Sequence, residues 1–200
     1  MFERLIGRQR SGEKSDAELH EAALKGSGDA MAALYRRHGG LVYRFTLRMS
    51  RDSSIAEEVT QEVFLALLSQ LDCFDSQKAA LSTWLCGIAR RQLWKHLGRF
   101  GDAAAAEDDA AEAESTEDSP VTWVLRQEAV ATVRDGLDEL PLPLKEVIVL
   151  CELEEMTYEQ AAMVLAVPIG TVRSRLHRAK ARLAELLRGN LVNAGGEKKC

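Results

Sequence analysis

The chain has 200 residues, a formal net charge of −5 and 46% hydrophobic residues, of which few are aromatic. This length allows one or two small domains with real cores, and the abundance of Ala, Leu, Glu and Arg favours helices. No apolar run approaches the length that spans a bilayer, and the charged first twenty residues are unlike a signal peptide. We therefore expect a cytoplasmic protein with no membrane insertion.

Chemically reactive groups are scattered along the chain. Cys73, Cys86, Cys151 and Cys200 lie far apart and form none of the close pairs of a zinc site or redox motif. We expect reduced thiols, with the first three in or near a core. The four histidines are equally dispersed, and neither a Ser-His-Asp order nor a phosphate-binding loop is present. The sequence thus predicts no enzyme, no catalytic residue, no metal and no cofactor.

The negative charge is concentrated in one short segment. Residues 1–100 carry 15 basic and 12 acidic side chains, residues 101–120 carry 8 acidic and no basic ones, and residues 121–200 carry 11 of each. The acidic segment, GDAAAAEDDAAEAESTEDSP, has no apolar stripe that could dock it, so we expect a flexible, disordered linker. It separates two helical blocks, which predicts an all-α fold of two small helical domains.

The first block covers residues 16–100 and follows an N-terminal extension at 1–15. A short amphipathic helix is expected around Leu19, followed by a break at 26–29 where Asp29 can cap the next helix. Apolar periodicity predicts further helices over 30–49, 55–71 and 81–97, with a loop over 72–80.

Two of these helices carry distinctive polar faces. In the helix over 55–71 the apolar side includes Leu67 and Leu68, and the opposite side holds four acidic or amide residues: Glu57, Glu58, Gln61 and Glu62. In the helix over 81–97, Arg91, Lys95 and Arg99 repeat every four residues and form one basic stripe.

The second block covers residues 121–188. One helix is expected over 123–140, and Pro141 and Pro143 separate it from a second helix over 144–153. Thr157 and Gln160 have the spacing of a capping box that starts a third helix. After Pro168 a last helix runs from about 169 to 187 with a single apolar stripe, and residues 189–200 are expected to be a disordered tail.

The last two helices of this block have the pattern of a helix-turn-helix, in which the second helix enters the major groove of DNA. Basic residues on a helix surface are usually only solvated, but their position directly after a capped helix and a tight turn favours DNA binding. Bases would meet Thr171, Arg173, Ser174 and His177, while base and phosphate contacts would be shared by Arg175, Arg178, Lys180 and Arg182.

The stretch MTYEQAAMVLAVPIGTVRSRLHRAKARL resembles the region 4 helix-turn-helix of bacterial sigma-70 family transcription initiation factors, in the extracytoplasmic-function (ECF) subgroup. In the first block, GDAMAALYRRHGGLVYRFTLR, AEEVTQEVFLALL and FDSQKAALSTWLCGIARRQLWKHLGR are similar to successive parts of sigma region 2. The resemblance covers about residues 16–188. It implies that 16–100 is region 2, that 121–188 is region 4 and that the chain directs promoter recognition and DNA melting, in a stress or environmental response.

The resemblance also implies roles for individual residues. Glu57, Glu58, Gln61 and Glu62 would bind the β′ clamp helices of core RNA polymerase, while region 4 would meet the β flap and the −35 element. Contact with the −10 element and the melted strand would fall to eight residues: Phe74, Lys78, Ser82, Thr83, Trp84, Arg90, Arg91 and Lys95. Arg91 and Lys95 replace the Asn and Asp usual in the family. An anti-sigma factor is a further expected partner.

Two other hypotheses remain open at this point. A stand-alone helix-turn-helix regulator would need an effector pocket or dimerisation helix in the first block, and palindromic sites. An adaptor or enzyme that uses the first block only for protein binding would not need the basic helix. The net charge of −5 predicts weak DNA binding by the free chain, which suits a subunit of a larger machine.

Overall fold

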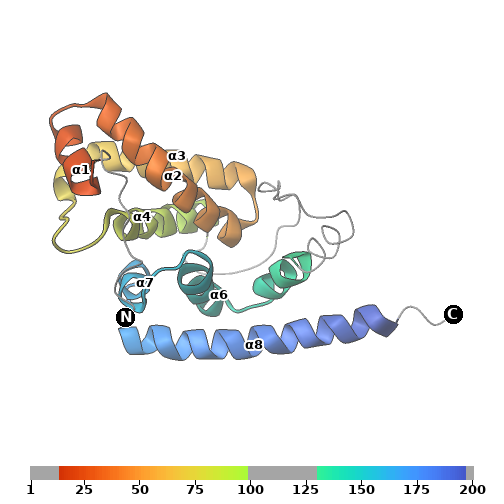
Figure 1. Ribbon diagram of the computed structural model, residues 1–200. Helices are drawn as coiled ribbons and strands as arrows, with labels where there is room; N and C mark the ends of the chain where they lie inside the picture. Colours follow the sequence, from red (N-terminus) through yellow and green to blue (C-terminus); the bar gives the residue numbers. More distant parts are fainter. Residues whose placement is uncertain (1–13, 99–129, 197–200) are drawn as a thin grey trace.

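The computed structural model describes residues 14–98 and 130–196, with side chains as far as residue 188, and this part of the chain is all-helical as predicted. The first bundle (residues 14–98) contains α1 (Asp16–Leu24), α2 (Gly28–Ser50), α3 (Ser53–Ser69), the 3-10 turn η1 (Leu71–Cys73) and α4 (Leu81–His96) (Figure 1). The second unit (residues 130–196) contains helical residues 130–138, α6 (Leu142–Ile148), the π-helical turn η2 (Val149–Leu153), α7 (Tyr158–Leu165) and α8 (Ile169–Gly196). The predicted linker, 101–120, lies outside the described residues.

Side-chain caps set where the first three helices begin. At α1, Ser15 accepts a hydrogen bond from the backbone N–H of Glu18 at 3.2 Å, and the Glu18 carboxylate accepts one from the backbone of Ser15 at 2.7 Å. Ser27 caps α2 and Asp52 caps α3. The prediction of Asp29 as a cap is wrong, because the helix begins earlier and Asp29 lies inside its first turn.

The first bundle is held together by an apolar core shared by α2, α3 and α4. Leu34, Phe45, Leu67, Leu85 and Leu93 are all completely buried there. Each helix contributes residues at three- and four-residue spacing, so the periodicity read from the sequence identifies the inward faces. The basic and acidic side chains discussed below are therefore carried on a rigid frame.

A charged contact fastens α1 to α2. Asp16 accepts hydrogen bonds from Arg37 at 2.6 Å and from the ring of His38 at 2.8 Å. Burial alone would raise the pKa of Asp16, but these hydrogen bonds outweigh it and hold the pKa below its ordinary value. The contact consequently adds stability above the ordinary carboxyl pKa and loses it as the pH falls through the lowered value.

The second unit contains the predicted helix-turn-helix. The capping box at the start of α7 is confirmed: Thr157 accepts from the backbone N–H of Gln160 at 3.2 Å, and the Gln160 side chain accepts from the backbone of Thr157 at 2.9 Å. Ala166, with a φ of 54°, ends α7 in the left-handed conformation, and α8 begins after Pro168.

Three helix boundaries of the second unit differ from the sequence prediction. The helix expected over 144–153 is α6 followed by the wide turn η2, which places Glu154 and Met156 in hydrogen bonds back to Val149 and Leu150. The helix α8 continues to Gly196, past the predicted end at about 187, since no proline follows to stop it. Of the helix expected over 123–140, residues 130–138 are helical and 121–129 lie outside the described residues.

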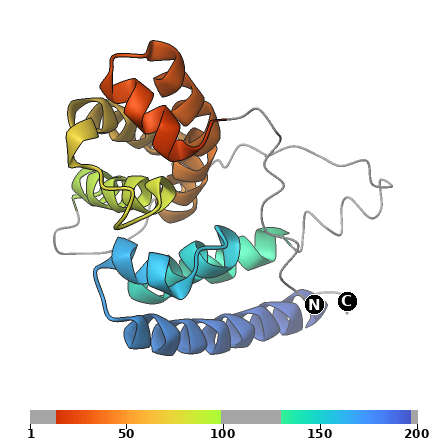
Figure 2. The ribbon, with the colours of Figure 1, turned by 60° about the vertical axis from the view of Figure 1, so that its left-hand side comes forward.

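The first bundle and the second unit pack directly against each other (Figure 2). The helix α7 contacts α4, and η2 contacts α2, so the end of α4 that carries Arg90 faces the second unit. The long helix α8 lies on the far side of the second unit, against α6 and α7 (Figure 1). Within residues 14–98 and 130–196, no helix combines the length and apolarity needed to cross a membrane.

We predict that Phe45→Ala lowers the free energy of unfolding of the first bundle by about 3–5 kcal/mol, because it opens a cavity in a fully buried site. Urea unfolding followed by tryptophan fluorescence measures this, since Trp84 and Trp94 lie in the same bundle. The control is Leu65→Ala, at a site that is 64% exposed, for which we expect a change within about 0.5 kcal/mol. Equal effects of the two variants would contradict the assigned core.

Candidate nucleic-acid interface

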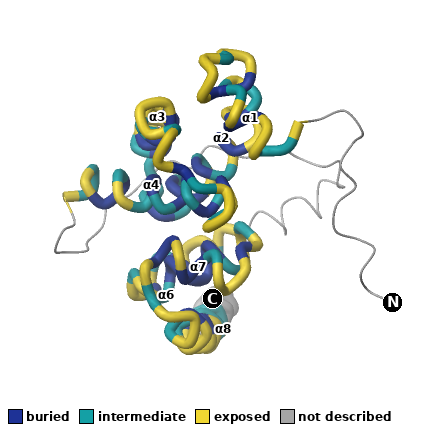
Figure 3. The backbone as a smooth tube through the Cα atoms, turned by 90° about the vertical axis from the view of Figure 1, so that its left-hand side faces the viewer, coloured by how far each residue is buried: buried dark blue, intermediate teal, exposed yellow. Residues whose placement is uncertain are grey.

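The helix-turn-helix exposes one basic face of α8. Val172, Leu176 and Ala179 are buried against the rest of the second unit, which turns the opposite side of the helix to solvent. Figure 3 shows this outer side of α8 as exposed. A second helix with its outer face free is the arrangement that enters a major groove.

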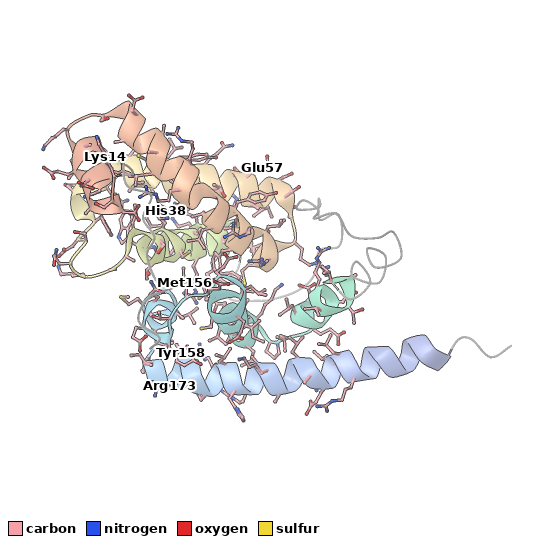
Figure 4. All side chains as sticks on the ribbon, in the orientation of Figure 1. Lys14, His38, Glu57, Met156, Tyr158 and Arg173 are labelled. Atoms are coloured by element: carbon pink, nitrogen blue, oxygen red, sulfur yellow. The ribbon has the colours of Figure 1, made fainter. Side chains whose placement is uncertain are left out.

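The predicted base-reading residues all lie on α8. Thr171 and Arg175 are partly buried, and the other five are exposed: Arg173, Ser174, His177, Arg178 and Arg182. The guanidinium carbon of Arg173 lies 5.8 Å from the centre of the Tyr158 ring, within the range of a cation–π contact. The two side chains lie together at the start of α8 (Figure 4), so Tyr158 helps to position Arg173.

Farther along α8 the basic residues have acidic neighbours. Lys180 pairs with Glu152 at 2.8 Å, and this hydrogen bond raises the pKa of Lys180 above its ordinary value. Arg182 pairs with Glu185 at 3.2 Å. These pairs are solvent-exposed and therefore weak, so a DNA phosphate can replace the carboxylate at little cost.

The residues predicted to meet the −10 element divide into two groups. Lys78, Arg91 and Lys95 are exposed, and Ser82 and Trp84 are partly buried. Lys78 pairs with Asp75 at 3.0 Å, which lowers the pKa of that carboxyl. These five side chains are accessible from solvent, as the prediction requires.

Phe74 and Thr83 lie inside the first bundle. Phe74 is 7% exposed and packs edge-on against His20, with ring centres 5.0 Å apart, and at a tilt against Trp84 at 5.6 Å. Thr83 is 3% exposed, and among the described residues its hydroxyl has no hydrogen-bond partner. The apolar stripe of α4 and the segment after η1 place both side chains in the core, and their contact with DNA stays a prediction.

Arg90 is the one predicted DNA contact on α4 that is paired across the domain junction. Its Nε donates to Glu146 of α6 at 2.5 Å, and its Nη2 donates to the second carboxylate oxygen at 3.4 Å. The Glu146 side chain is almost completely buried by this contact. In this arrangement the second unit covers Arg90.

The predicted polymerase-binding face of α3 is on the surface. Glu57, Glu58 and Gln61 are exposed, and Glu62 is partly buried. His96 from α4 reaches this face, with Nε2 3.0 Å from Glu62 and Nδ1 3.7 Å from Glu58. The three ligand atoms lie within 4.8 Å of one another, a grouping of donor types that binds divalent cations. Contact between the His96 ring and the two carboxylates accounts for this geometry without an ion, so we assign no metal here.

Sequence reasoning missed the apolar continuation of the α3 face. Leu65 is 64% exposed and Leu68 is 52% exposed, although Leu68 was predicted to point inward. Leu67 occupies the inward position, and the next residue is rotated by about 100° around the helix. The spacing of Glu57, Gln61, Leu65 and Leu68 places them on one side of α3, and this pattern is the signal that could have found them.

The three cysteines within the described part of the chain lie apart from one another and have no disulfide partner there. Cys86 is buried and Cys151 partly so, and burial raises the pKa of these thiols to about 12 and about 11. They are therefore protonated and unreactive near neutral pH. Cys73 is exposed, contrary to the prediction that it lies in or near the core, because it belongs to the surface turn η1. Cys200 lies outside the described residues.

Comparison with known protein families gives two matches. Sigma-70 region 2 matches residues 34–100, which covers most of the first bundle. Sigma-70 region 4 matches residues 131–183, which contains the helix-turn-helix. The order of the two regions is the order that the sequence resemblance predicted.

Individual relatives span nearly the whole chain. The chain is 31% identical over 184 residues to the ECF RNA polymerase sigma factor SigE of Mycolicibacterium smegmatis, covering 88% of this chain and 70% of the relative. It is 31% identical over 191 residues to the RNA polymerase sigma-H factor of Pseudomonas aeruginosa, covering 91% and 98%. Among solved structures, CnrH in complex with the cytosolic domain of CnrY is similar at 27% identity and a TM-score of 0.67, covering 88% and 99%.

We predict that Thr83→Val keeps or raises stability, by up to about 1 kcal/mol, because it removes a buried hydroxyl without a partner and preserves the shape of the side chain. Thermal unfolding of the full chain measures this. The companion variant Thr46→Val should lose about 1 kcal/mol, because the Thr46 hydroxyl is also buried but donates to the carbonyl of Val42 at 2.8 Å. Destabilisation by Thr83→Val to the same extent would contradict the assigned environment.

Proposed function

We propose a function for this chain from the premise that these matches establish: it belongs to the sigma-70 family of RNA polymerase sigma factors, in the ECF subgroup. It is not an enzyme but a factor that directs RNA polymerase to promoters. The proposal concerns how the individual residues of this chain share that task.

The observation that carries the proposal is the separation of two surfaces on one molecule. The acidic face of α3, marked by Glu57, and the basic face of α8, marked by Arg173, lie far apart and on different units (Figure 4). A protein that must hold polymerase and DNA at the same time needs two such surfaces. Glu57, Glu58, Gln61 and Glu62 are assigned to the β′ clamp helices, extended by Leu65 and Leu68.

DNA contacts are assigned by unit. The polar residues on the outer side of α8, from Thr171 to Arg182, read the −35 element in the major groove, with the Arg side chains suited to guanine edges. In the first bundle, Lys78, Ser82, Trp84, Arg91 and Lys95 line the path of the −10 element and the melted strand, where bases stack and phosphates meet cations. Arg90 joins them when its pair with Glu146 opens. We assign 16–100 to region 2, 121–188 to region 4 and 101–120 to the connection between them.

Protein partners follow from the same assignment. Core RNA polymerase binds through the β′ clamp helices and the β flap, which places the action of the chain in the cytoplasm. CnrH was solved with the cytosolic domain of CnrY, and we propose a protein inhibitor, an anti-sigma factor, for this chain as well. The inducing condition is proposed to be a stress or environmental change.

The stand-alone regulator and the adaptor lose their support. Both leave the region 2 match over residues 34–100 without a role, whereas the sigma-factor assignment uses it for polymerase and −10 binding. The regulator also needs a dimerisation element, and the described helices of the first bundle are used in its own core.

We predict that purified core polymerase with this chain starts transcription at new discrete positions on genomic fragments of the source organism, and that these starts share a two-part upstream motif. Arg173→Ala should lose most of these starts, because one good bidentate base contact gives about 1–3 kcal/mol of discrimination. Arg134→Ala, at an exposed site outside α8, is the matched control and should retain them. Run-off transcription with sequencing of the 5′ ends is the measurement. Unchanged starts with Arg173→Ala would contradict its assigned role.

A separate prediction concerns α3. Leu65→Ser should weaken binding of the chain to core polymerase by about 1–2 kcal/mol, since an exposed apolar side chain at an interface contributes only when the partner covers it. Leu24→Ser, at an exposed site of α1, is the control and should leave the affinity unchanged. Surface-based binding measurements with immobilised core polymerase provide the affinities. Equal affinities of the two variants for core polymerase would contradict the assignment of Leu65 to the interface.

A further inference from the structure

Four arginines of the first bundle pair with four carboxylates of the second unit. Arg44 Nη2 lies 3.0 Å from Glu154, and Arg48 pairs with the other oxygen of the same carboxylate. Arg90 pairs with Glu146. Arg51, the residue that follows α2, pairs with Asp138 and lies 3.4 Å from Asp135. We refer to these residues of the first bundle as the arginine cluster: Arg44, Arg48, Arg51 and Arg90.

Burial differs between the two sides of this contact. The side chains of Glu154 and Glu146 are 1% and 3% exposed, whereas Arg44 keeps 52% and Arg48 32% of its surface. Proximity to Arg44 and partial burial lower the pKa of Arg48, with burial the larger cause. The arginines thus already form a solvated, like-charged surface, and the carboxylates are inserted into it.

The contact between the two units is weak enough to open. Withdrawing a carboxylate from water costs several kcal/mol, and its attraction to a paired arginine does little more than offset that cost. Separation of the two units returns both charges to water together, so neither is left buried and unpaired. The closed arrangement is therefore a reversible state.

The arginine cluster is also suited to bind a second kind of anion, a phosphate group. A guanidinium binds carboxylates and phosphates through the same planar pair of N–H donors, and arginine is the preferred residue for both. Arg44 and Arg48 are one turn apart on α2 and face the same side. Arg90 continues the positive surface onto α4, next to Arg91 and Lys95, so the cluster adjoins the proposed strand path.

We propose that the arginine cluster binds the phosphate backbone of promoter DNA, and that Glu146 and Glu154 occupy it in the free factor. The second unit then competes with DNA for the same guanidinium groups until it moves away. This extends the DNA-binding surface of the first bundle from α4 to α2. It rests on the proposed function only in naming promoter DNA as the ligand.

The test measures binding of the full chain, without polymerase, to a labelled 20-base-pair duplex of random sequence by fluorescence anisotropy over a series of salt concentrations. The variant Glu146→Gln with Glu154→Gln keeps the side-chain shapes and removes both charges. We expect about tenfold tighter binding, and a salt dependence steeper by about 0.9 for each additional phosphate that the protein neutralises. The control pair, Glu139→Gln with Glu155→Gln, makes the same change of net charge at exposed sites.

A second set of variants identifies the groups that bind. We call the variant Glu146→Gln with Glu154→Gln the opened variant. Adding Arg44→Gln and Arg48→Gln to it should remove most of the increase in DNA affinity and lower the salt slope by about 2. Arg36→Gln with Lys25→Gln, both at exposed sites, is the charge-matched control and should retain most of the increase. Loss of the increase only in the Arg44 and Arg48 variant supports the cluster as the phosphate-binding surface.

Three outcomes overturn the proposal. Equal affinities of the opened variant and its control mean that the carboxylates do not block DNA. An increase in affinity that survives loss of Arg44 and Arg48 means that phosphates bind elsewhere. If the opened variant binds an acidic protein tightly but does not bind DNA, the ligand of the arginine cluster is a protein and not DNA. If the double variant does not fold, as judged by thermal unfolding, Glu154→Gln alone is used with Glu155→Gln as its control.

Core polymerase binding of every variant is measured in parallel. If the unaltered chain does not bind core polymerase, the proposed function is contradicted. The duplex measurement still tests the arginine cluster, because it contains no polymerase. Small-angle scattering of the opened variant gives an independent readout, because separation of the two units increases the radius of gyration. An unchanged radius together with unchanged DNA affinity contradicts the competition between Glu146, Glu154 and DNA.

Discussion

Two buried carboxylates determine how the halves of this molecule sit together. Glu146 and Glu154 are withdrawn from water at the junction, and an ionised group in that position must be paired. Their partners, Arg90 and the Arg44–Arg48 pair, belong to the other half of the chain. The orientation of the second unit is therefore tied to the charges on α2 and α4. As a direct consequence Arg90 of α4 is partly covered, while Arg91 and Lys95 stay exposed.

The sequence predicts those features of the fold that are decided by neighbours in the chain. The capping box of Thr157 and Gln160, the break at Pro168 and the apolar stripe of α8 each depend on residues three or four positions apart. The recognition helix and its exposed basic residues could be predicted for the same reason. Where two capping residues stood close together, as Ser27 and Asp29 do, local pattern alone did not decide between them.

The rest depends on contacts that have no local pattern. Arg90 and Glu146 are 56 positions apart, and Arg44 and Glu154 are 110 apart, so neither pairing leaves a periodic signal. His96 reaches Glu58 and Glu62 only because α3 and α4 lie side by side. Phe74 and Thr83 were assigned to DNA by resemblance, but the same segment must also close the core of the first bundle. For residues of this kind, only the packing of the helices decides whether the side chain lies in the core or on the surface.

The outer face of α8 and the arginine cluster, the two surfaces that we propose to bind DNA, differ in what covers them. The outer face of α8 is exposed in the closed arrangement, whereas the guanidinium groups of the arginine cluster already have carboxylate partners. A chain of net charge −5 in which four arginines are paired with its own carboxylates is expected to attract phosphates weakly, because non-specific affinity depends on the number of phosphates that are neutralised. A polymerase that holds the two units at separate places would expose the cluster and position α8 in the same event. On this proposal strong DNA binding arises only in the complex, and an acidic protein can carry a basic recognition helix without being trapped on non-promoter DNA.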